Sequence, residues 1–392
     1  MTTAVDDAAA RRSQLAAIEQ SGVAERFHLL QLRNPALWVL LWGIVAGAVR
    51  TFTFYRPGTG NYGGALAAGS VTFAIYTVAW LVFLHWLDRY TPMRPGLLAV
   101  GFIWGAFAGT LFLALTVNTA LLTLYAKWFG PTWANDWSAA LTAPFTEETA
   151  KAIGFVLLLG LAPKLIRSAF DGFVLGAFIG LGFEVAEDVL YVYQGASAHF
   201  GTRQVADSVQ MIAARSVAGV ASHALFSALV CCGLMWILGR DPRGRHVGKG
   251  LLLVVTAMVL HGCWDASATI GTSIGGPVLG AAMTPILVVV GIAVVLVVGR
   301  DAAVTDRGWA RAILAPEVER GTLDQAELAA VAGTHRDRRH FVKAAHGHHG
   351  RRVAKHLVAA GRDLLEAIGR SGGEETPEVE HARQEVARLR TV

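Results

Sequence analysis

The chain alternates long apolar stretches with short polar connectors, and this pattern predicts its architecture. Each stretch has the length of about 20 residues that an α-helix needs to cross the hydrocarbon core of a bilayer. The short alternating segments of a membrane β-barrel are a poor match to this pattern. We therefore predict about eight membrane-spanning helices, at residues 36–55, 65–86, 97–121, 138–161, 168–193, 209–238, 250–270 and 277–298.

The two ends of the chain are more polar than its middle. Residues 1–35 have mixed charge, and we expect them to form a cytosolic lead-in to a transmembrane core at 36–299. After this core, residues 300–392 are charged and rich in alanine, which predicts a cytosolic tail of two or three amphipathic helices. The predicted fold class is an all-α, polytopic membrane protein with a helical cytosolic tail.

Composition supports a membrane protein and argues against a soluble one. Of the 392 residues, 54% are hydrophobic and only 16% are charged, and the mean hydropathy is +0.46. The net charge of +5 could suggest a nucleic-acid partner, but the basic residues concentrate in the connectors and the tail. Membrane orientation explains them more simply, so no nucleic acid is expected. The three cysteines form no metal-binding motif.

The distribution of lysine and arginine predicts the orientation. The connector 240–249, the pair Lys164 and Arg167, and the tail are all basic, and the positive-inside rule places them in the cytosol. With eight spans both termini are then cytosolic. We expect a multi-pass protein of the plasma membrane.

Three charged residues interrupt the fourth predicted span: Glu147, Glu148 and Lys151. A charge at membrane depth costs ~2.5 kcal/mol or more on insertion scales, so such residues usually face a bundle interior or a wet cavity. Helical spacing brings both glutamates within reach of Lys151. One internal ion pair would leave one carboxyl group available for chemistry.

The next three spans also contain ionisable residues, several of them at three- or four-residue spacing. They are Glu184, Glu187, Asp188 and Tyr191 in the fifth span, Arg215 and His223 in the sixth, and His261 and Asp265 in the seventh. Each group alone has a structural interpretation, such as an internal ion pair or a polar contact between helices. Their occurrence on successive spans favours a functional site.

Depth along the helices sorts these residues into two layers. Counted inward from the presumed outer ends at the helical rise, Glu148, His223 and His261 lie ~16 to 24 Å deep. The shallower residues, at ~9 to 12 Å by the same rise, are Glu187, Asp188, Arg215 and Asp265. We interpret Arg215 as the counter-charge of Glu187 or Asp188. Glu148, Glu187, His223 and His261 remain as the groups that could handle a water molecule or a metal ion.

The tail contains a basic stretch at 336–355 with a cluster of His346, His348 and His349. A histidine cluster can bind metal. On a solvated basic tail, we favour a surface that contacts anionic lipid or a partner.

Four local motifs, in order on successive spans, resemble the PrsW family of intramembrane proteases, within the CAAX prenyl protease superfamily. They are Glu147-Glu148-Thr149-Ala150-Lys151; Gly182-Phe183 with Glu187-Asp188 and Tyr191; Arg215 with His223-Ala224-Leu225-Phe226; and His261-Gly262 with Asp265. The chain departs from the family pattern at Asp188, where an asparagine is usual. The resemblance covers about 141–267. It implies peptide-bond hydrolysis within the membrane, typically of a single-pass protein such as an anti-sigma factor.

Two mechanisms remain open. Without a metal, Glu148 would activate a water molecule held by Glu187 or His223, and His261 with Asp265 would stabilise the oxyanion. With a metal, His223, His261 and Glu187 would bind zinc, and Glu148 would again be the base. In either version Glu147 belongs to the catalytic group, whereas Lys151, Asp188 and Arg215 form supporting ion pairs.

Two other functions compete with a protease. Chains of intramembrane Asp, Glu and His residues also occur in proton-coupled transporters, although no second copy of the Glu-Glu-x-x-Lys motif suggests an inverted repeat. An inactive relative that binds membrane peptides is the other alternative. The presence of Glu147, Glu148 and both histidines argues against it.

Overall fold

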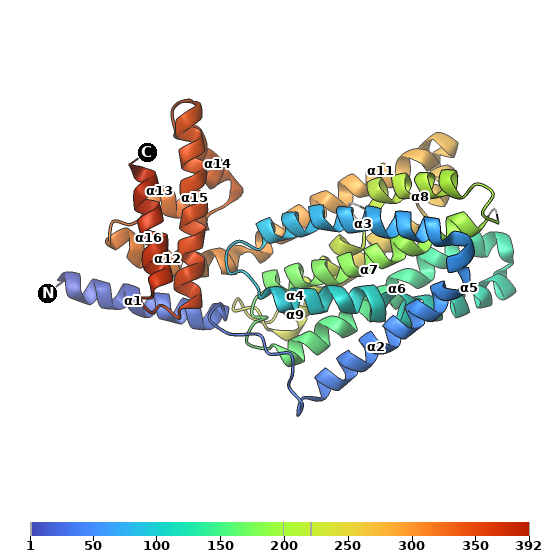
Figure 1. Cartoon of the computed structure of the whole chain (residues 1–392), viewed down its shortest axis with the longest axis horizontal. Coiled ribbons are helices and arrows are strands. Elements are labelled where there is room, and N and C mark those ends of the chain that lie inside the picture. The colour runs from blue at the N-terminus through green and yellow to red at the C-terminus, as the bar shows by residue number, and fades with distance from the viewer. Residues whose placement is uncertain (1, 199, 220–221, 392) are drawn as a thin grey trace.

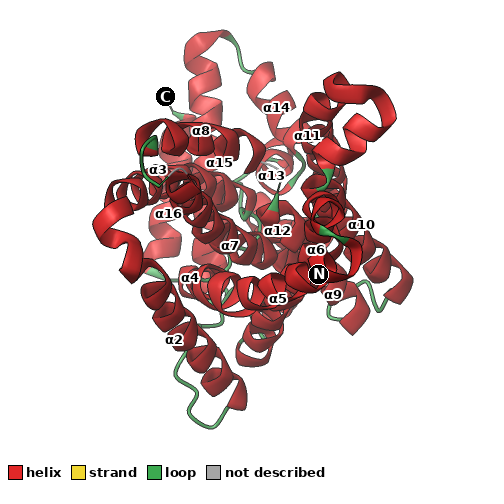
Figure 2. Ribbon diagram, turned by 90° about the vertical axis from the view of Figure 1, so that its right-hand side faces the viewer, coloured by secondary structure: helices red, strands yellow, loops and turns green. Residues whose placement is uncertain are grey.

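The computed structural model describes residues 2–198, 200–219 and 222–391, and its regular elements there are all helices. Figure 1 shows two parts: a bundle of long, roughly parallel helices, and a smaller group of helices at one end of it. An end-on view in Figure 2 shows helices joined by short loops. The predicted class of an all-α, polytopic membrane protein is confirmed.

A helix occupies each of the eight predicted spans. The elements of the bundle are α2 (Pro35–Tyr55), α3 (Thr59–Leu87), α4 (Pro95–Ile103), the π-helix η2 (Trp104–Ala114), α5 (Leu115–Phe129), α6 (Pro131–Leu161), α7 (Ala169–Ala198), α8 (Gln204–Ala218), α9 (His223–Leu238), α10 (Val247–Asp265) and α11 (Ser267–Ala302). A one-turn 3₁₀ helix, η1 (Arg56–Gly58), joins α2 to α3.

Four stretches of the described helices are long and apolar enough to cross a membrane by length and composition: Pro35–Leu87, which contains both α2 and α3, Pro95–Phe129, Val247–Asp265 and Ser267–Ala302. The helices α6 and α7 are also long, with 31 and 30 residues, but they contain the acidic residues of the candidate site. Their charges are buried among neighbouring helices rather than exposed to lipid.

Two predicted connectors differ from the structure. We expected Trp128, Trp133 and Trp137 in a connector, but α5 continues to Phe129 and α6 begins at Pro131. Gly130 alone makes the turn, at a φ of 88° that favours glycine. The aromatic rings still gather there, with 4.5 Å between the ring centroids of Phe129 and Trp133. Such a cluster is typical of a membrane interface.

The sixth predicted span, 209–238, is two helices rather than one. The helix α8 ends at Ala218, and α9 begins at His223 after the non-helical residue Ser222. Residues 220 and 221 of the prediction lie outside the described residues. The histidine expected in the interior of a span therefore stands at the beginning of a helix.

The boundary between the seventh and eighth spans is also shifted. We expected a seventh span to residue 270, but α10 ends at Asp265 and α11 begins at Ser267. Gly275 and Gly276 break α11, and Ser267 Oγ lies 2.8 Å from Thr284 Oγ1, which a straight helix would place far apart. The first turns of α11 therefore fold back on its long second part.

Five helices follow the bundle: α12 (Val304–Glu319), α13 (Gln325–Ala332), α14 (His335–Ala344), α15 (Gly347–Arg370) and α16 (Pro377–Arg390). Capping boxes start α13 and α14, because the side chains of Asp324 and Thr334 accept hydrogen bonds from the backbone three residues later. The N-terminal helix α1 (Thr2–Ser21) joins this group: Gln14 Nε2 donates to the Ile313 carbonyl of α12. The two ends of the chain thus form one helical tail domain.

The basic connectors lie on the side of the bundle that meets this tail domain. Lys249 Nζ lies 2.5 Å from Asp301 Oδ2, and Lys164 Nζ lies 3.4 Å from Glu25 Oε1. Both termini are on that side (Figure 1). The prediction that this side is cytosolic rests on the positive-inside rule.

Candidate functional site

Trp104 of η2 holds the middle of α6 in place. Its Nε1–H donates to the Ala150 carbonyl at 2.9 Å. Its ring fills a gap that two glycines leave open: a Cβ at Gly154 would lie 2.1 Å from Trp104 Cδ1, and one at Gly43 would lie 2.6 Å from Cζ3. This contact fixes the position of the α6 turns that carry the paired glutamates.

Lys151 is the centre of the charged cluster on α6, and it is 1% exposed. Its Nζ lies 2.7 Å from Glu148 Oε1 and 3.8 Å from Glu147 Oε2. It also lies 2.9 Å from His223 Nδ1 and 4.0 Å from the centroid of the Phe183 ring. Both glutamates therefore approach the same ammonium group, as the helical spacing indicated.

The two glutamates differ in how their oxygens are engaged. Glu148 Oε1 contacts Lys151, and its Oε2 accepts a hydrogen bond from Ser227 Oγ at 3.1 Å. Glu147 Oε1 accepts from Asn118 Nδ2 at 3.1 Å, but its Oε2 is buried and has no hydrogen-bond partner among the described residues. A buried acceptor without a partner is unfavourable, so Glu147 Oε2 is the atom placed to receive a proton or a metal ion.

His261 reaches this cluster because α10 approaches α6 closely. A Cβ at the next residue, Gly262, would lie 2.9 Å from the Ala140 carbonyl and 3.5 Å from Pro144 Cγ. Pro144 has no N–H, so the Ala140 carbonyl has no partner in the α6 ladder at that position. The small residue lets His261 Nε2 come within 3.6 Å of Glu147 Oε2 and its Nδ1 within 3.2 Å of Glu148 Oε1.

His223 stands in the first turn of α9, held there by α7. A Cβ at Gly180 would lie 2.2 Å from the His223 carbonyl, so only glycine permits this approach. Glu184, one turn further along α7 and 0% exposed, accepts the Ala224 N–H of α9 at 3.4 Å. Tyr76 of α3 donates to the other oxygen of Glu184 at 3.0 Å. Glu184 therefore caps the helix that begins with His223.

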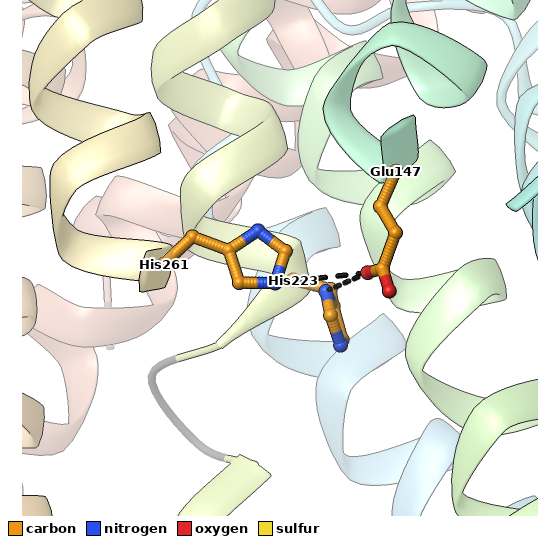
Figure 3. Close-up of side chains that lie close together, drawn as sticks. All are labelled: Glu147, His223 and His261. Atoms are coloured by element: carbon orange, nitrogen blue, oxygen red, sulfur yellow. Dashed lines mark ion pairs between the residues drawn. The ribbon is translucent and has the colours of Figure 1, made fainter. Parts of the chain in front are cut away.

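Glu147, His223 and His261 converge from three helices, as Figure 3 shows. Glu147 Oε2 lies 3.6 Å from His223 Nδ1 and 3.6 Å from His261 Nε2, and the three ligand atoms all lie within 4.8 Å of one another. Ligands that surround a metal ion tetrahedrally at ~2.0 to 2.2 Å are roughly 3.3 to 3.6 Å apart. The group therefore fits a metal ion, provided that the Lys151 ammonium gives up its contact with His223 Nδ1.

Each histidine has a second carboxylate on its other ring nitrogen. His223 Nε2 lies 2.8 Å from Glu187 Oε2, and His261 Nδ1 lies 3.2 Å from Glu148 Oε1 but makes no hydrogen bond among the described residues. A carboxylate behind a histidine accepts its N–H and leaves the opposite nitrogen as the ligand, as in many metal sites. Here those opposite nitrogens are the two that face Glu147.

Arg215 of α8 connects the shallower acids. Its Nη2 lies 2.9 Å from Glu187 Oε2 and its Nε lies 2.5 Å from Asp188 Oδ1, so it pairs with both. Its guanidinium lies over the Tyr191 ring, 4.6 Å from the centroid. Asp265, with a side chain that is 20% exposed, approaches His261 Nε2 at 3.7 Å. The two predicted layers therefore meet through His223 and His261.

A cleft of about 380 Å³ opens on the apolar surface of the bundle and reaches Glu148. At its mouth, Ile153 is 41% and Val156 is 50% exposed. The cleft lies between α6, α9 and α10, and its lining includes Glu148, Ala152, Val156, Val230, Val254 and Met258.

The structure brings together every residue of the sequence-predicted site, but with one difference in grouping. We expected Glu187 beside the two histidines as the third ligand, whereas Glu147 occupies that place and Glu187 lies behind His223. Among the described residues, no other group of three acidic, histidine or cysteine ligand atoms comes together in this way, and the tail histidines His346, His348 and His349 are exposed.

Sequence reasoning named Glu184 among the ionisable residues of the fifth span without giving it a role, and it did not identify Asn118, Ser227 or Tyr76. Asn118 and Ser227 contact the glutamates, and Tyr76 and Glu184 position His223. The signal available was weak, because a single polar residue in an apolar helix usually makes a helix-to-helix hydrogen bond.

The PrsW family intramembrane metalloprotease model matches residues 93–299, a little over half of the chain. The chain belongs to the PrsW family. The resemblance drawn from the four motifs is thereby confirmed, and the protein is an intramembrane protease that resides in a lipid bilayer. The matched region contains every charged residue of the candidate site, whereas Tyr76 lies before it, and it ends before the tail helices. Comparison with curated proteins and with solved structures gives no further match.

Proposed function

We propose that this PrsW-family protease hydrolyses a peptide bond of another membrane protein at a zinc site formed by Glu147, His223 and His261. The observation that carries the proposal is the buried approach of these three ligand atoms around an unpartnered glutamate oxygen. Two nitrogens and one carboxylate oxygen are an acceptable set for catalytic zinc, which keeps a further position for water or substrate. The ion would supply a Lewis acid that polarises the scissile carbonyl.

The other charged residues would have distinct roles. Glu148 is the proposed general base, because it adjoins the ligand group and is the one carboxylate that also lines the cleft. Ser227 and Lys151 hold its two oxygens, so one of these contacts must loosen when it takes a proton. Glu187 holds the tautomer of His223, and Arg215 balances the charges of Glu187 and Asp188.

The cleft indicates how a substrate would reach the buried residues. Glu147, Glu148 and His261 are at most 4% exposed, so a peptide must approach through an opening. The opening that reaches Glu148 has an apolar lining. An apolar transmembrane segment, of a single-pass protein such as an anti-sigma factor, would suit it.

Metal analysis of purified variants tests the assignment. Glu147→Gln, His223→Ala and His261→Ala should each lower the bound zinc from near one equivalent, whereas Glu148→Gln should keep the metal. His85→Ala, on an exposed histidine at the end of α3, is the matched control and should keep both metal and activity. Full retention of zinc by Glu147→Gln would contradict its assignment as a ligand.

Cleavage of a fluorogenic peptide with an apolar transmembrane stretch tests the chemistry. Glu148→Gln keeps the shape of the side chain but removes its basicity, so the rate should fall at least ~100-fold, the lower end of what a positioned base contributes. A chelator should abolish the activity of the wild-type enzyme and added zinc should restore it. Full activity of a metal-free preparation would contradict the zinc site and leave the glutamate mechanism without a metal.

A further inference from the structure

A second charged cluster lies where the tail domain meets the membrane bundle, and the protease site does not use it. At its centre is Arg362 of α15, whose Nε and Nη2 are buried and have no hydrogen-bond partner among the described residues. An unpartnered buried guanidinium is unfavourable, because its N–H groups have lost water without gaining an acceptor. A missing acceptor is therefore expected close by.

Other cations, rather than acids, surround this guanidinium. Burial and the charges of Arg338 and Arg89 lower the pKa of Arg362 to about 10. Arg89 in turn is repelled by Arg338 of α14 and by Arg307 of α12. The acid that acts on Arg362 is the neighbouring Asp363, which is exposed. No carboxylate forms an ion pair with these four arginines in the described part of the chain.

Aromatic rings hold Arg89 in position. Its guanidinium lies 4.6 Å from the centroid of the Trp86 ring and 4.5 Å from that of Tyr90. Its Nη2 donates to the Tyr90 hydroxyl at 2.7 Å, and that hydroxyl donates to the Gly333 carbonyl at 2.9 Å. Its Nη1 also donates to the Trp86 carbonyl at 3.4 Å, so Arg89 is held in position and other N–H groups of its guanidinium remain for a ligand.

Several other arginines of the tail domain provide a contrast. Arg383 pairs with Glu317 and Glu375, Arg388 with Glu385, and Arg390 with Glu327. The tail therefore has enough acidic residues to neutralise arginines where it needs to. Arg362 differs from these paired arginines because its Nε and Nη2 are buried without a partner among the described residues.

We propose that Arg89, Arg338 and Arg362 form a binding site for a phosphate group. Guanidinium groups bind phosphate through several charge-assisted hydrogen bonds, and three together would suit one dianion. The group could belong to the headgroup of an anionic phospholipid or to free phosphate. The chemistry of the three guanidinium groups favours neither source. Trp86 lies in the last turn of α3, and its ring centroid lies 6.1 Å from that of His335. The cluster therefore lies at the end of the second predicted span, where lipid headgroups are expected.

Thermal unfolding of the delipidated, detergent-purified full-length protein tests the site with inorganic phosphate. Phosphate should raise the Tm of the wild type, whereas Arg362→Gln should weaken phosphate binding about 10- to 100-fold, as expected for one charge-assisted contact. Without phosphate, Arg362→Gln should raise the Tm, because it removes a repelled charge. Arg388→Gln, on an arginine with its own glutamate partner, is the control and should respond to phosphate like the wild type.

Native mass spectrometry distinguishes the lipid source. Protein extracted from membranes that contain phosphatidylglycerol should retain one molecule of this lipid, and Arg338→Gln and Arg362→Gln should lose it while Arg388→Gln keeps it. Retention of no lipid, together with stabilisation by phosphate, would assign the site to free phosphate. A wild type that neither retains the lipid nor gains Tm with phosphate would overturn the proposal, as would a lower Tm of Arg362→Gln without phosphate.

Discussion

The two buried charged regions of this protease are organised in opposite ways. In the membrane, one lysine is surrounded by Glu147, Glu148 and His223. At the junction with the tail domain, like charges gather instead. Arginines surround Arg362. The buried acids Asp88 and Asp306 lie near each other, and the charge of Asp306 helps to raise the pKa of Asp88. Hydrocarbon supplies no counter-ion, so a charge there must find its partner within the protein. The junction is at the membrane edge, where protons and anions are available.

Loss of the lysine from the membrane cluster should have the largest effect on stability. Lys151→Met removes the cation that both glutamates share, and breaking a buried pair costs about 3–5 kcal/mol. Unfolding in detergent should show a lower midpoint, and less folded protein should accumulate. Lys249→Met, on a lysine that is 37% exposed and pairs with Asp301, is the control and should change the midpoint little. An unchanged midpoint for Lys151→Met would mean that the glutamates do not depend on it.

The acidic part of the junction should respond to pH in the opposite direction from an ordinary paired carboxylate. Burial raises the pKa of Asp306 to about 6, and the Asp306 carboxylate is fully buried with one unpartnered oxygen. Because the folded-state pKa is above the ordinary aspartate value of 3.8, the stabilising contribution of protonated Asp306 is complete below about pH 4 and is lost as the pH rises to about 6. A rise of about two in this pKa lowers the free energy of unfolding above pH 6 by about 3 kcal/mol.

Asp306→Asn should therefore make the protein more stable at pH 7 and remove the decline in Tm between pH 4 and pH 6. Thermal unfolding across this range is the measurement. Glu380→Gln, on an exposed glutamate of α16, should leave the decline in place. A decline of the same size in Asp306→Asn would assign it to other groups, of which Asp88 is the next to examine, since burial raises its pKa to about 7.

The close contact between α7 and α9 beside the membrane cluster should tolerate no larger side chain at Gly180. Gly180→Ala would bring a Cβ to 2.2 Å from the His223 carbonyl, so α7 and α9 must separate. Overpacking of this kind costs about 1–3 kcal/mol, and here it should also weaken zinc binding. Gly308→Ala in α12 meets nothing within 4 Å and should instead stabilise its helix by up to about 1 kcal/mol. Equal zinc affinity in Gly180→Ala and the wild type would show that His223 adjusts independently.

The smallest expected effect concerns the cap of α9. Tyr76→Phe removes one hydrogen bond to Glu184, which is worth about 1 kcal/mol. If Glu184 positions His223, zinc affinity should fall by a few-fold in Tyr76→Phe and by more in Glu184→Ala, with partial recovery in Glu184→Gln. Metal titration of the three variants measures this order. A loss of Tm without any change in zinc affinity would limit Glu184 to a structural role.

Hydrophobic patterning was sufficient to place helices in all eight predicted spans, because a helix in lipid needs a long apolar stretch. It misplaced connectors where the determinant was local: the single-residue turn at Gly130, the break before His223 and the fold-back at Gly275. The tail was expected to have two or three helices, and it has five, of which α12 packs against α1. The helices α13 and α14 have 8 and 10 residues, fewer than the roughly 11 to 18 over which a helical period can be read from a sequence.

The sequence by itself indicated which residues of this protein are candidates for chemistry, since charge within an apolar span is costly enough to suggest function. Helical spacing also determined that Lys151 meets both glutamates. Only the tertiary structure decided that Glu147, rather than Glu187, faces both histidines, and that Glu184 caps the helix of His223. Those relations depend on how far one helix is rotated and shifted against another. Close contacts at Gly180, Gly154 and Gly262 set these parameters, and periodicity within one helix carries no information about them.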